Sequence, residues 1–323
     1  FGSELKALRA HSGFDAPIDR EALTAFFRFG YVPGPRSIYR GVCKLSPGTY
    51  MALTADGAGQ PKPYWSAEDL PQVPTAVFQN DRAAADALES LLMDAVGRRM
   101  VADVPLGAFL SGGLDSSLVV ALMQRLSGRP VKTFTIGFDV EGFDEAQAAR
   151  AVAAHIGTDH TELYVTPRQA LDVIPRLPAI YDEPFSDSSQ IPTLLISQLA
   201  RSQVTVALSG DGGDELFGGY TRYVWATQLW AAARLLPLWF RRAMAGRVSA
   251  QSAAWLDALA GSTVGRLSGR SALRYPGDKL SKAASVLTAS DQDGLYRRLV
   301  SLWKEPAELT GTVEPRSRFD DES

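Results

Sequence analysis

The sequence predicts an α/β fold built around a doubly wound parallel sheet, and three observations lead to this prediction. Between residues 104 and 208, short apolar runs of strand length alternate with stretches of helical length, which is typical of βαβ units. Two of these runs end in clusters of Gly, Ser and Asp, as expected where strands of an open parallel sheet meet a ligand. After residue 220 the chain is rich in Ala, Leu, Arg and Trp without a strand pattern, which indicates a helical C-terminal part.

The first 66 residues precede the alternating region and predict a separate unit. Asp19 is a candidate N-cap for a helix over residues 21–29, and residues 45–53 are typical of a turn followed by a strand. Residues 67–80 contain two prolines and little periodicity, so we expect a linker there.

The second predicted unit covers residues 81–323. It begins with a helix over residues 83–100, in which large apolar residues recur on one side. The strands that follow are predicted at residues 104–110, 131–136, 160–165 and 203–208. The helices that connect them are predicted at residues 116–127, 144–156, 167–181 and 190–201.

The most informative motif is the octet Leu-Ser-Gly-Gly-Leu-Asp-Ser-Ser at residues 110–117, between the first of these strands and its helix. Its glycines, Gly112 and Gly113, allow the backbone to approach a ligand, and the free N–H groups of the helix start point at it. Asp115 would repel a phosphate unless a cation lay between them, so the loop predicts a phosphate bound with a divalent metal. Further donors are the hydroxyls of Ser111, Ser116 and Ser117. A plain helix N-cap after a glycine turn is the alternative interpretation.

A second cluster, at residues 209–220, follows the apolar run at 204–208. Its sequence is Ser-Gly-Asp-Gly-Gly-Asp-Glu-Leu-Phe-Gly-Gly-Tyr. Crowded carboxylates repel one another unless a cation is near, and so many glycines do not favour a regular element. We therefore expect Asp115 and Asp214 to share one Mg²⁺ on a pyrophosphate group; a solvated acidic turn is the alternative.

Composition excludes several function classes. The 323 residues are 46% hydrophobic and 21% charged with a net charge of −3, which argues against a nucleic-acid-binding surface. No apolar run reaches the roughly 18 residues of a membrane span. The single cysteine, Cys43, excludes an internal disulfide and suits a cytoplasmic protein.

Taken together, these motifs resemble the asparagine synthetase family in its bacterial glutamine-hydrolysing type. The octet resembles the pyrophosphate loop of enzymes that split ATP into AMP and pyrophosphate, and residues 209–220 resemble a second synthetase motif. The remaining similar segments are residues 1–8, 45–48, 64–65, 134–138 and 182–185. The resemblance implies the fold of a pyrophosphate-loop ATP pyrophosphatase over 81–323, and the C-terminal remnant of a glutamine amidotransferase domain over 1–66.

The resemblance also implies a reaction: ATP activates the side-chain carboxylate of aspartate as an acyl-adenylate, and ammonia from glutamine then gives asparagine, AMP and pyrophosphate. Asp211 is implied as the base that deprotonates ammonium, with Glu215 helping to hold substrate. The backbone of Ile136 is implied to hold adenine. The implied ATP-binding set is Leu110, Ser111, Gly112, Gly113, Asp115, Ser116, Ser117, Ile136, Ser209 and Gly210, with a homodimer as a possible assembly.

Three departures from the family pattern qualify this interpretation. Position 211 is commonly Glu in housekeeping members but Asp here, which suggests a specialised branch. The family's N-terminal catalytic cysteine and a later Lys/Asp/Arg segment are both missing, so we expect a fragment of a longer polypeptide. We expect this fragment by itself to make no ammonia from glutamine and to adenylate its substrate poorly or not at all. Two alternatives stay open: a ligase acting on another carboxylate in polysaccharide or secondary metabolism, and a non-catalytic nucleotide-binding protein.

Overall fold

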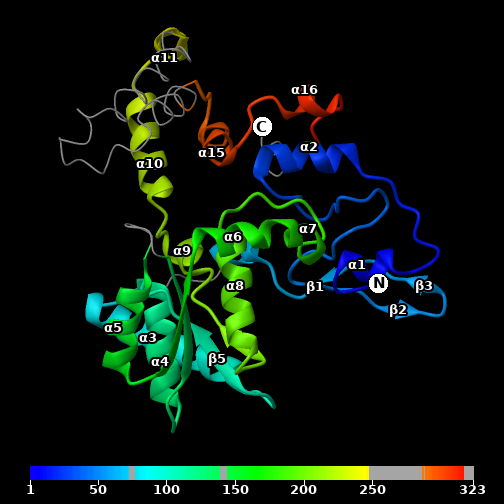
Figure 1. The fold of residues 1–323 in the computed structure, drawn as a ribbon. Coiled ribbons are helices and arrows are strands. Elements are labelled where there is room, and N and C mark those ends of the chain that lie inside the picture. The colour runs from blue at the N-terminus through cyan, green and yellow to red at the C-terminus, as the bar shows by residue number, and fades with distance from the viewer. Residues whose placement is uncertain (73–76, 139–143, 247–285, 287, 316–323) are drawn as a thin grey trace. The chain divides into compact units, whose positions relative to one another are not determined.

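The computed structural model describes residues 1–72, 77–138, 144–246, 286 and 288–315, which form two compact units. One unit contains Phe1–Phe14 and Lys44–Gly218, and the other contains Asp15–Cys43 and Gly219–Ser323. We describe each unit by itself (Figure 1). This division does not follow the predicted boundaries at residues 66 and 81, which stay predictions about family domains.

The first unit is built on a four-stranded parallel sheet in the order β7-β6-β5-β8. The strands are β5 (Leu106–Phe109), β6 (Lys132–Phe138), β7 (Asp159–Val165) and β8 (Val206–Leu208). The chain winds outward from β5 through β6 to β7 and then returns to add β8 on the other side of β5. The predicted α/β fold with a parallel sheet is therefore confirmed, and its winding direction reverses between β5 and β8.

Helices cover both faces of this sheet (Figure 1). Neighbouring residues of a strand point to opposite faces, and Ala108 and Phe109 of β5 do so. Ala108 packs with Val120 and Ala149 in one buried cluster, whereas Phe109 packs in a second cluster with Phe134. The first cluster is covered by α3 (Asp81–Arg99), α4 (Leu114–Leu126) and α5 (Ala146–Ile156), and the second by α8 (Gln190–Arg201).

The single helix predicted over residues 167–181 is wrong, because this segment is broken into three pieces. They are α6 (Pro167–Val173), the 3-10 turn η2 (Ile174–Arg176) and α7 (Leu177–Ile180). Thr166 caps α6 through a capping box with Gln169. Pro175 and Pro178 each lack the N–H that a continuous helix needs, which is why the helix does not run through.

Before α3, the first unit consists of short elements. They are α1 (Leu5–Arg9), β1 (Thr49–Tyr50) paired with β4 (Lys62–Pro63), β2 (Leu53–Thr54) paired with β3 (Gly57–Ala58), and η1 (Ala67–Gln72). The strand expected after the turn at residues 45–48 is thus split into two antiparallel pairs. None of the described helices is long and apolar enough to cross a membrane.

The second unit joins one early helix to the end of the chain. Its described helices are α2 (Arg20–Phe29), α10 (Thr221–Ala233), α11 (Leu238–Gly246), α15 (Gln292–Val300) and α16 (Pro306–Thr310). Asp19 caps α2 by accepting from the backbone N–H of Glu21, and Gly30 ends it in a left-handed conformation, so the predicted helix is confirmed. Residue 286 and residues 288–315 are described, whereas part of the predicted helical region lies outside the described residues.

Buried polar contacts hold α2 against α16. The hydroxyls of Thr24 and Thr310 lie 2.6 Å apart, and both side chains are buried. Arg28 makes a two-pronged ion pair with Glu314, at 2.7 Å from Nε to Oε1 and 2.5 Å from Nη2 to Oε2. Arg297 adds a further bond of 3.0 Å to the same carboxylate. Burial raises the pKa of Glu314, but the hydrogen bonds from the two arginines outweigh it and leave the pKa below its ordinary value.

Because the folded-state pKa of Glu314 is lowered, its contribution to stability is present above the ordinary pKa and is lost as pH falls through the lowered value. We expect Glu314→Gln to reduce the free energy of unfolding at pH 7 by about 1–3 kcal/mol. The difference from the wild type should shrink as pH falls below about 4.5. Urea unfolding between pH 3 and 7 measures this. Glu308→Gln, an exposed change on α16, is the control, and equal pH profiles for the wild type and Glu314→Gln would contradict the prediction.

Candidate active site

Two loops leave the sheet side by side where its winding reverses. β5 and β8 are hydrogen-bonded neighbours, and Ala108 pairs with Leu208 at the end of the register. Because parallel strands end at the same edge, the loops at residues 110–117 and 209–215 both begin there. The structure therefore brings together the two clusters that the sequence singled out.

The loop at residues 110–117 is anchored at its start by β6. The backbone N–H of Leu110 donates to the carbonyl of Phe134 at 2.9 Å, and the hydroxyl of Thr135 donates to the carbonyl of Leu110. Leu110 and Thr135 are both buried. Thr135 was not among the predicted site residues, although a threonine at a buried position of an apolar strand signals that its hydroxyl has a specific partner.

Hydroxyl groups within the loop hold its shape. The Oγ atoms of Ser111 and Ser116 lie 2.9 Å apart, and Ser116 Oγ also accepts from the backbone N–H of Ser111 at 3.2 Å. The backbone N–H of Gly113 donates to Ser111 Oγ at 3.3 Å. These bonds curl the chain into the first turn of α4, whose earliest N–H groups have no carbonyl partner within the helix.

Gly112 is required where the loop meets α5. Its φ is +80°, a conformation that side-chain-bearing residues rarely adopt. A Cβ atom there would lie 2.7 Å from the backbone nitrogen of Ala149 and 2.8 Å from the side chain of Ala148. The sequence predicts that the glycine backbone approaches a ligand. At Gly112 the close approach is to the helix α5.

Glycines in the second loop bring it against the start of α4. A Cβ atom on Gly210 would lie 2.7 Å from the backbone nitrogen of Ser116, and one on Gly213 would lie 2.5 Å from Cγ of Asp115. The Asp115 carboxylate therefore lies against the residue that precedes Asp214. Glycine at these two positions is what allows the predicted pair of metal ligands to come from adjacent points of the two loops.

The acidic side chains at this edge differ in their partners. The carboxylates of Asp115 and Asp214 have no hydrogen-bond or ion-pair partner in the described part of the chain, whereas Asp211 accepts from the hydroxyl of Ser209 at 3.0 Å. The described residues contain no group of three or more His, Cys, Asp or Glu side chains that would hold a metal by itself. Two carboxylates nevertheless suit Mg²⁺, since this ion commonly takes one or two carboxylates and completes its shell with phosphate oxygens and water.

The other predicted residues occupy the same edge with less defined roles. Ile136 lies near the end of β6, half-buried and paired in register with Leu163 of β7. Glu215 is exposed on the short helix α9 (Gly213–Phe217). The Oγ of Ser117 is buried and has no hydrogen-bond partner among the described residues, which leaves one donor at the start of α4 unsatisfied.

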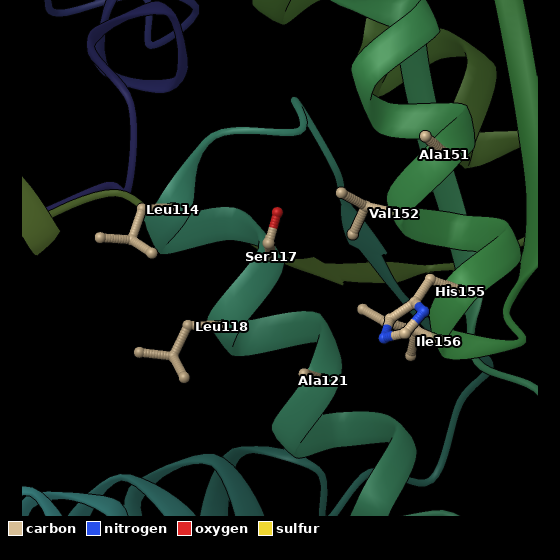
Figure 2. Close-up of a pocket in the computed structure, with 8 residues that line it drawn as sticks. All are labelled: Leu114, Ser117, Leu118, Ala121, Ala151, Val152, His155 and Ile156. Carbon is tan, nitrogen blue, oxygen red and sulfur yellow. The ribbon is translucent and has the colours of Figure 1, made fainter.

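A separate apolar groove of about 500 Å³ runs between α4 and α5 (Figure 2). It is lined by Leu114, Ser117, Leu118, Ala121, Ala151, Val152, His155 and Ile156. Of the residues predicted to bind ATP, only Ser117 lies in this lining, and neither Asp115 nor Asp214 does. This groove is therefore largely distinct from the residues predicted to bind ATP.

Comparison with known families shows which family the chain matches. Residues 87–319 match the family model described as asparagine synthase. The chain belongs to the asparagine synthase family. Residues 1–65 match the model of a glutamine amidotransferase domain. The family resemblance predicted from the motifs is confirmed.

Curated relatives support the same assignment. The chain is 36% identical over 223 residues to asparagine synthetase [glutamine-hydrolyzing] 1 of Bacillus subtilis, covering 69% of this chain and 34% of the relative. It is 39% identical over 213 residues to a putative asparagine synthetase [glutamine-hydrolyzing] of Mycobacterium tuberculosis, covering 65% and 32%. For the putative asparagine synthetase [glutamine-hydrolyzing] 2 of Methanocaldococcus jannaschii the identity is 38% over 228 residues, covering 69% and 43%. The matched part thus spans less than half the length of these relatives.

The close approach at Gly210 yields a prediction. In Gly210→Ala the new Cβ meets backbone atoms, which cannot rotate away, so we expect the free energy of unfolding to fall by about 1–3 kcal/mol. Separation of the two loops should weaken ATP binding by roughly tenfold or more, since a displaced site loses preorganised contacts. Isothermal titration with Mg-ATP measures the affinity, and urea unfolding measures the stability.

Gly128→Ala is the matched control, because nothing lies within 4 Å of its added Cβ. Its stability should stay within about 0.5 kcal/mol of the wild type. Wild-type stability and ATP affinity in Gly210→Ala would contradict the packing described above.

Proposed function

We propose that this chain carries the site of an ATP-dependent carbon–nitrogen ligase. A carboxylate attacks the α-phosphorus of ATP, pyrophosphate leaves, and ammonia then displaces AMP from the acyl-adenylate to form an amide. One observation supports this most. The loop at residues 110–117 after β5, which is the proposed pyrophosphate loop, is in contact with the acidic loop at residues 209–215 after β8. The names of the relatives indicate the side chain of aspartate as the carboxylate and glutamine as the ammonia source.

In this proposal the pyrophosphate loop stabilises the leaving group. Negative charge grows on the pyrophosphate oxygens as the bond to the α-phosphorus breaks, and preorganised donors aimed at that charge favour the transition state. The backbone N–H groups at the start of α4 and the Ser117 hydroxyl are such donors. Held by Asp115 and Asp214, Mg²⁺ would offset part of the same charge.

The second step needs a proton acceptor, and we propose Asp211. Ammonium must lose a proton before its nitrogen can attack, and a positioned carboxylate is suited to take it. Ser209 Oγ donates to Asp211 Oδ2 at 3.0 Å, and the backbone N–H of Asp211 donates back to that hydroxyl at 3.4 Å. This pair of bonds orients the Asp211 carboxylate at the end of β8. Glu215 is proposed to hold the acceptor, and Ile136 the adenine.

Product analysis tests the proposal. The chain is incubated with ATP, Mg²⁺, aspartate and ammonium chloride, and AMP, pyrophosphate and asparagine are quantified. We expect all three products in the wild type, formed at a low rate, and none in Asp115→Asn, whose thermal unfolding should match the wild type. AMP and pyrophosphate formed only with another acid would replace aspartate as the acceptor, and ATP binding without turnover would overturn the ligase proposal in favour of a nucleotide-binding protein.

Asp211→Asn separates the two chemical steps. Because Asp211 acts after adenylate formation in this proposal, we expect ATP affinity and single-turnover pyrophosphate release to stay within about twofold of the wild type. Amide formation should fall by roughly 10²-fold, the usual contribution of general base catalysis. Asp211→Glu keeps a carboxylate and is the control. If Asp211→Asn forms the amide at the wild-type rate, another group is the base.

A further inference from the structure

Two lysines from the segment matched to a glutamine amidotransferase domain pair with two acids in the segment matched to asparagine synthase. Lys6 Nζ lies 3.1 Å from Asp182 Oδ1, and the backbone N–H of Lys6 donates to Asp182 Oδ2 at 2.9 Å. Lys44 Nζ lies 2.5 Å from Glu183 Oε2. All four residues belong to the first compact unit, so these contacts join the two family segments within one body. We call the two pairs the lysine clasp.

The two acids of the clasp are largely shielded from water, so each depends on its lysine to offset its charge. The side chains of Asp182 and Glu183 are only 11% and 17% exposed. Burial raises the pKa of Asp182, but hydrogen bonds from the backbone and the ammonium group of Lys6 outweigh it, so the pKa lies below its ordinary value. Lys6 also donates to the carbonyl of Ile180 at 3.2 Å. Removing a lysine would leave a poorly hydrated carboxylate without its cation, which is costly.

The clasp holds the segment that leads into α8. Tyr181 donates its hydroxyl proton to the carbonyl of Gln190 at 3.2 Å, and the Gln190 side chain donates to the carbonyl of Phe185 at 3.2 Å. These bonds tie residues 181–189 to the first residue of α8. Since α8 leads into the start of the parallel strand β8, its own start lies toward the opposite edge of the sheet, where the two loops of the candidate site emerge.

We propose that Lys6 and Lys44 are positioning residues for the synthetase reaction, acting through Asp182 and Glu183 on the start of α8. The proposal rests on the function proposed above. The groups assigned to ATP lie on other elements, namely β5, α4, β6 and the end of β8. We therefore expect loosening of the clasp to shift the start of α8 at this edge and to slow amide formation, while nucleotide binding stays in place. Through the clasp, the amidotransferase-matched segment contributes to the geometry of a site it does not itself line.

Exchanging the charges of Lys6 and Asp182 in the full chain tests this positioning role. We expect Lys6→Glu to lower kcat for ammonium-dependent amide formation by roughly tenfold or more, as a small misplacement of reacting groups does, with the Kd for Mg-ATP changed by less than about twofold. The double variant Lys6→Glu/Asp182→Lys restores the opposite charges and should recover most of kcat, and Lys6→Arg should retain it. If Lys6→Glu does not fold, Lys6→Gln takes its place in the comparison.

A second readout is independent of activity. Hydrogen–deuterium exchange of the amides of residues 181–190 should rise in Lys6→Glu and return toward the wild type in the double variant. Glu4→Gln is the matched control, because Lys6 also pairs with the exposed Glu4 at 2.8 Å and that pair is not part of the proposal. This variant should leave both exchange and kcat unchanged.

The two proposals fail in different ways. A wild type that makes no amide overturns the proposed function and the kinetic part of the inference, while altered exchange at residues 181–190 would still show that the clasp holds the segment. Unchanged exchange in Lys6→Glu overturns the clasp itself. A third outcome is that kcat, ATP affinity and global stability fall equally and the double variant restores none of them. Lys6 would then act on folding alone, which would also overturn the proposed positioning role.

Discussion

The hydrogen-bonded pairing of β5 with β8 is the constraint on which the rest of the candidate site depends. Parallel neighbours release their following loops at one edge, and here one loop carries hydroxyl and backbone donors while the other carries carboxylates. The winding reverses between these strands, so α4 and α8 cover opposite faces and do not close the edge between them. Gly210 and Gly213 then allow the loops to touch, because any side chain at either position would meet α4.

Two pairs of carboxylates in this unit differ in what neutralises them. Asp182 and Glu183 are shielded from water and paired with lysines, so their charge is compensated within the protein. Asp115 and Asp214 have no such partner among the described residues, although they come from loops in contact. Neighbouring carboxylates without internal compensation favour a cation or a cationic ligand. In the proposed function, the first pair of acids therefore holds the fold, whereas the second pair is available to a substrate complex.

The sequence predicted the local elements well because each depends on local chemistry. Apolar runs predicted the four strands, and Asp19 predicted the start of α2. Strand order did not follow from the sequence, because periodicity does not show which strands are neighbours. The helix predicted over 167–181 does not form as one piece, because two prolines lie inside it. The pairing of Lys6 with Asp182, residues 176 positions apart, has no local signal at all.

Within the candidate site, some features belong to the family as a whole, whereas others depend on a single side chain. The loops and their glycines are features of the backbone, and in the proposed function they bind phosphate and metal whatever the acceptor. Residue 211 is different, because its side-chain length sets how far the proposed base reaches from β8. An aspartate bonded to Ser209 holds its carboxylate close to the strand end, whereas the glutamate common in housekeeping members would extend further. In the proposed function, an acceptor must bring its amide-forming carbon within reach of this shorter residue, a requirement that the proposed pyrophosphate loop does not impose.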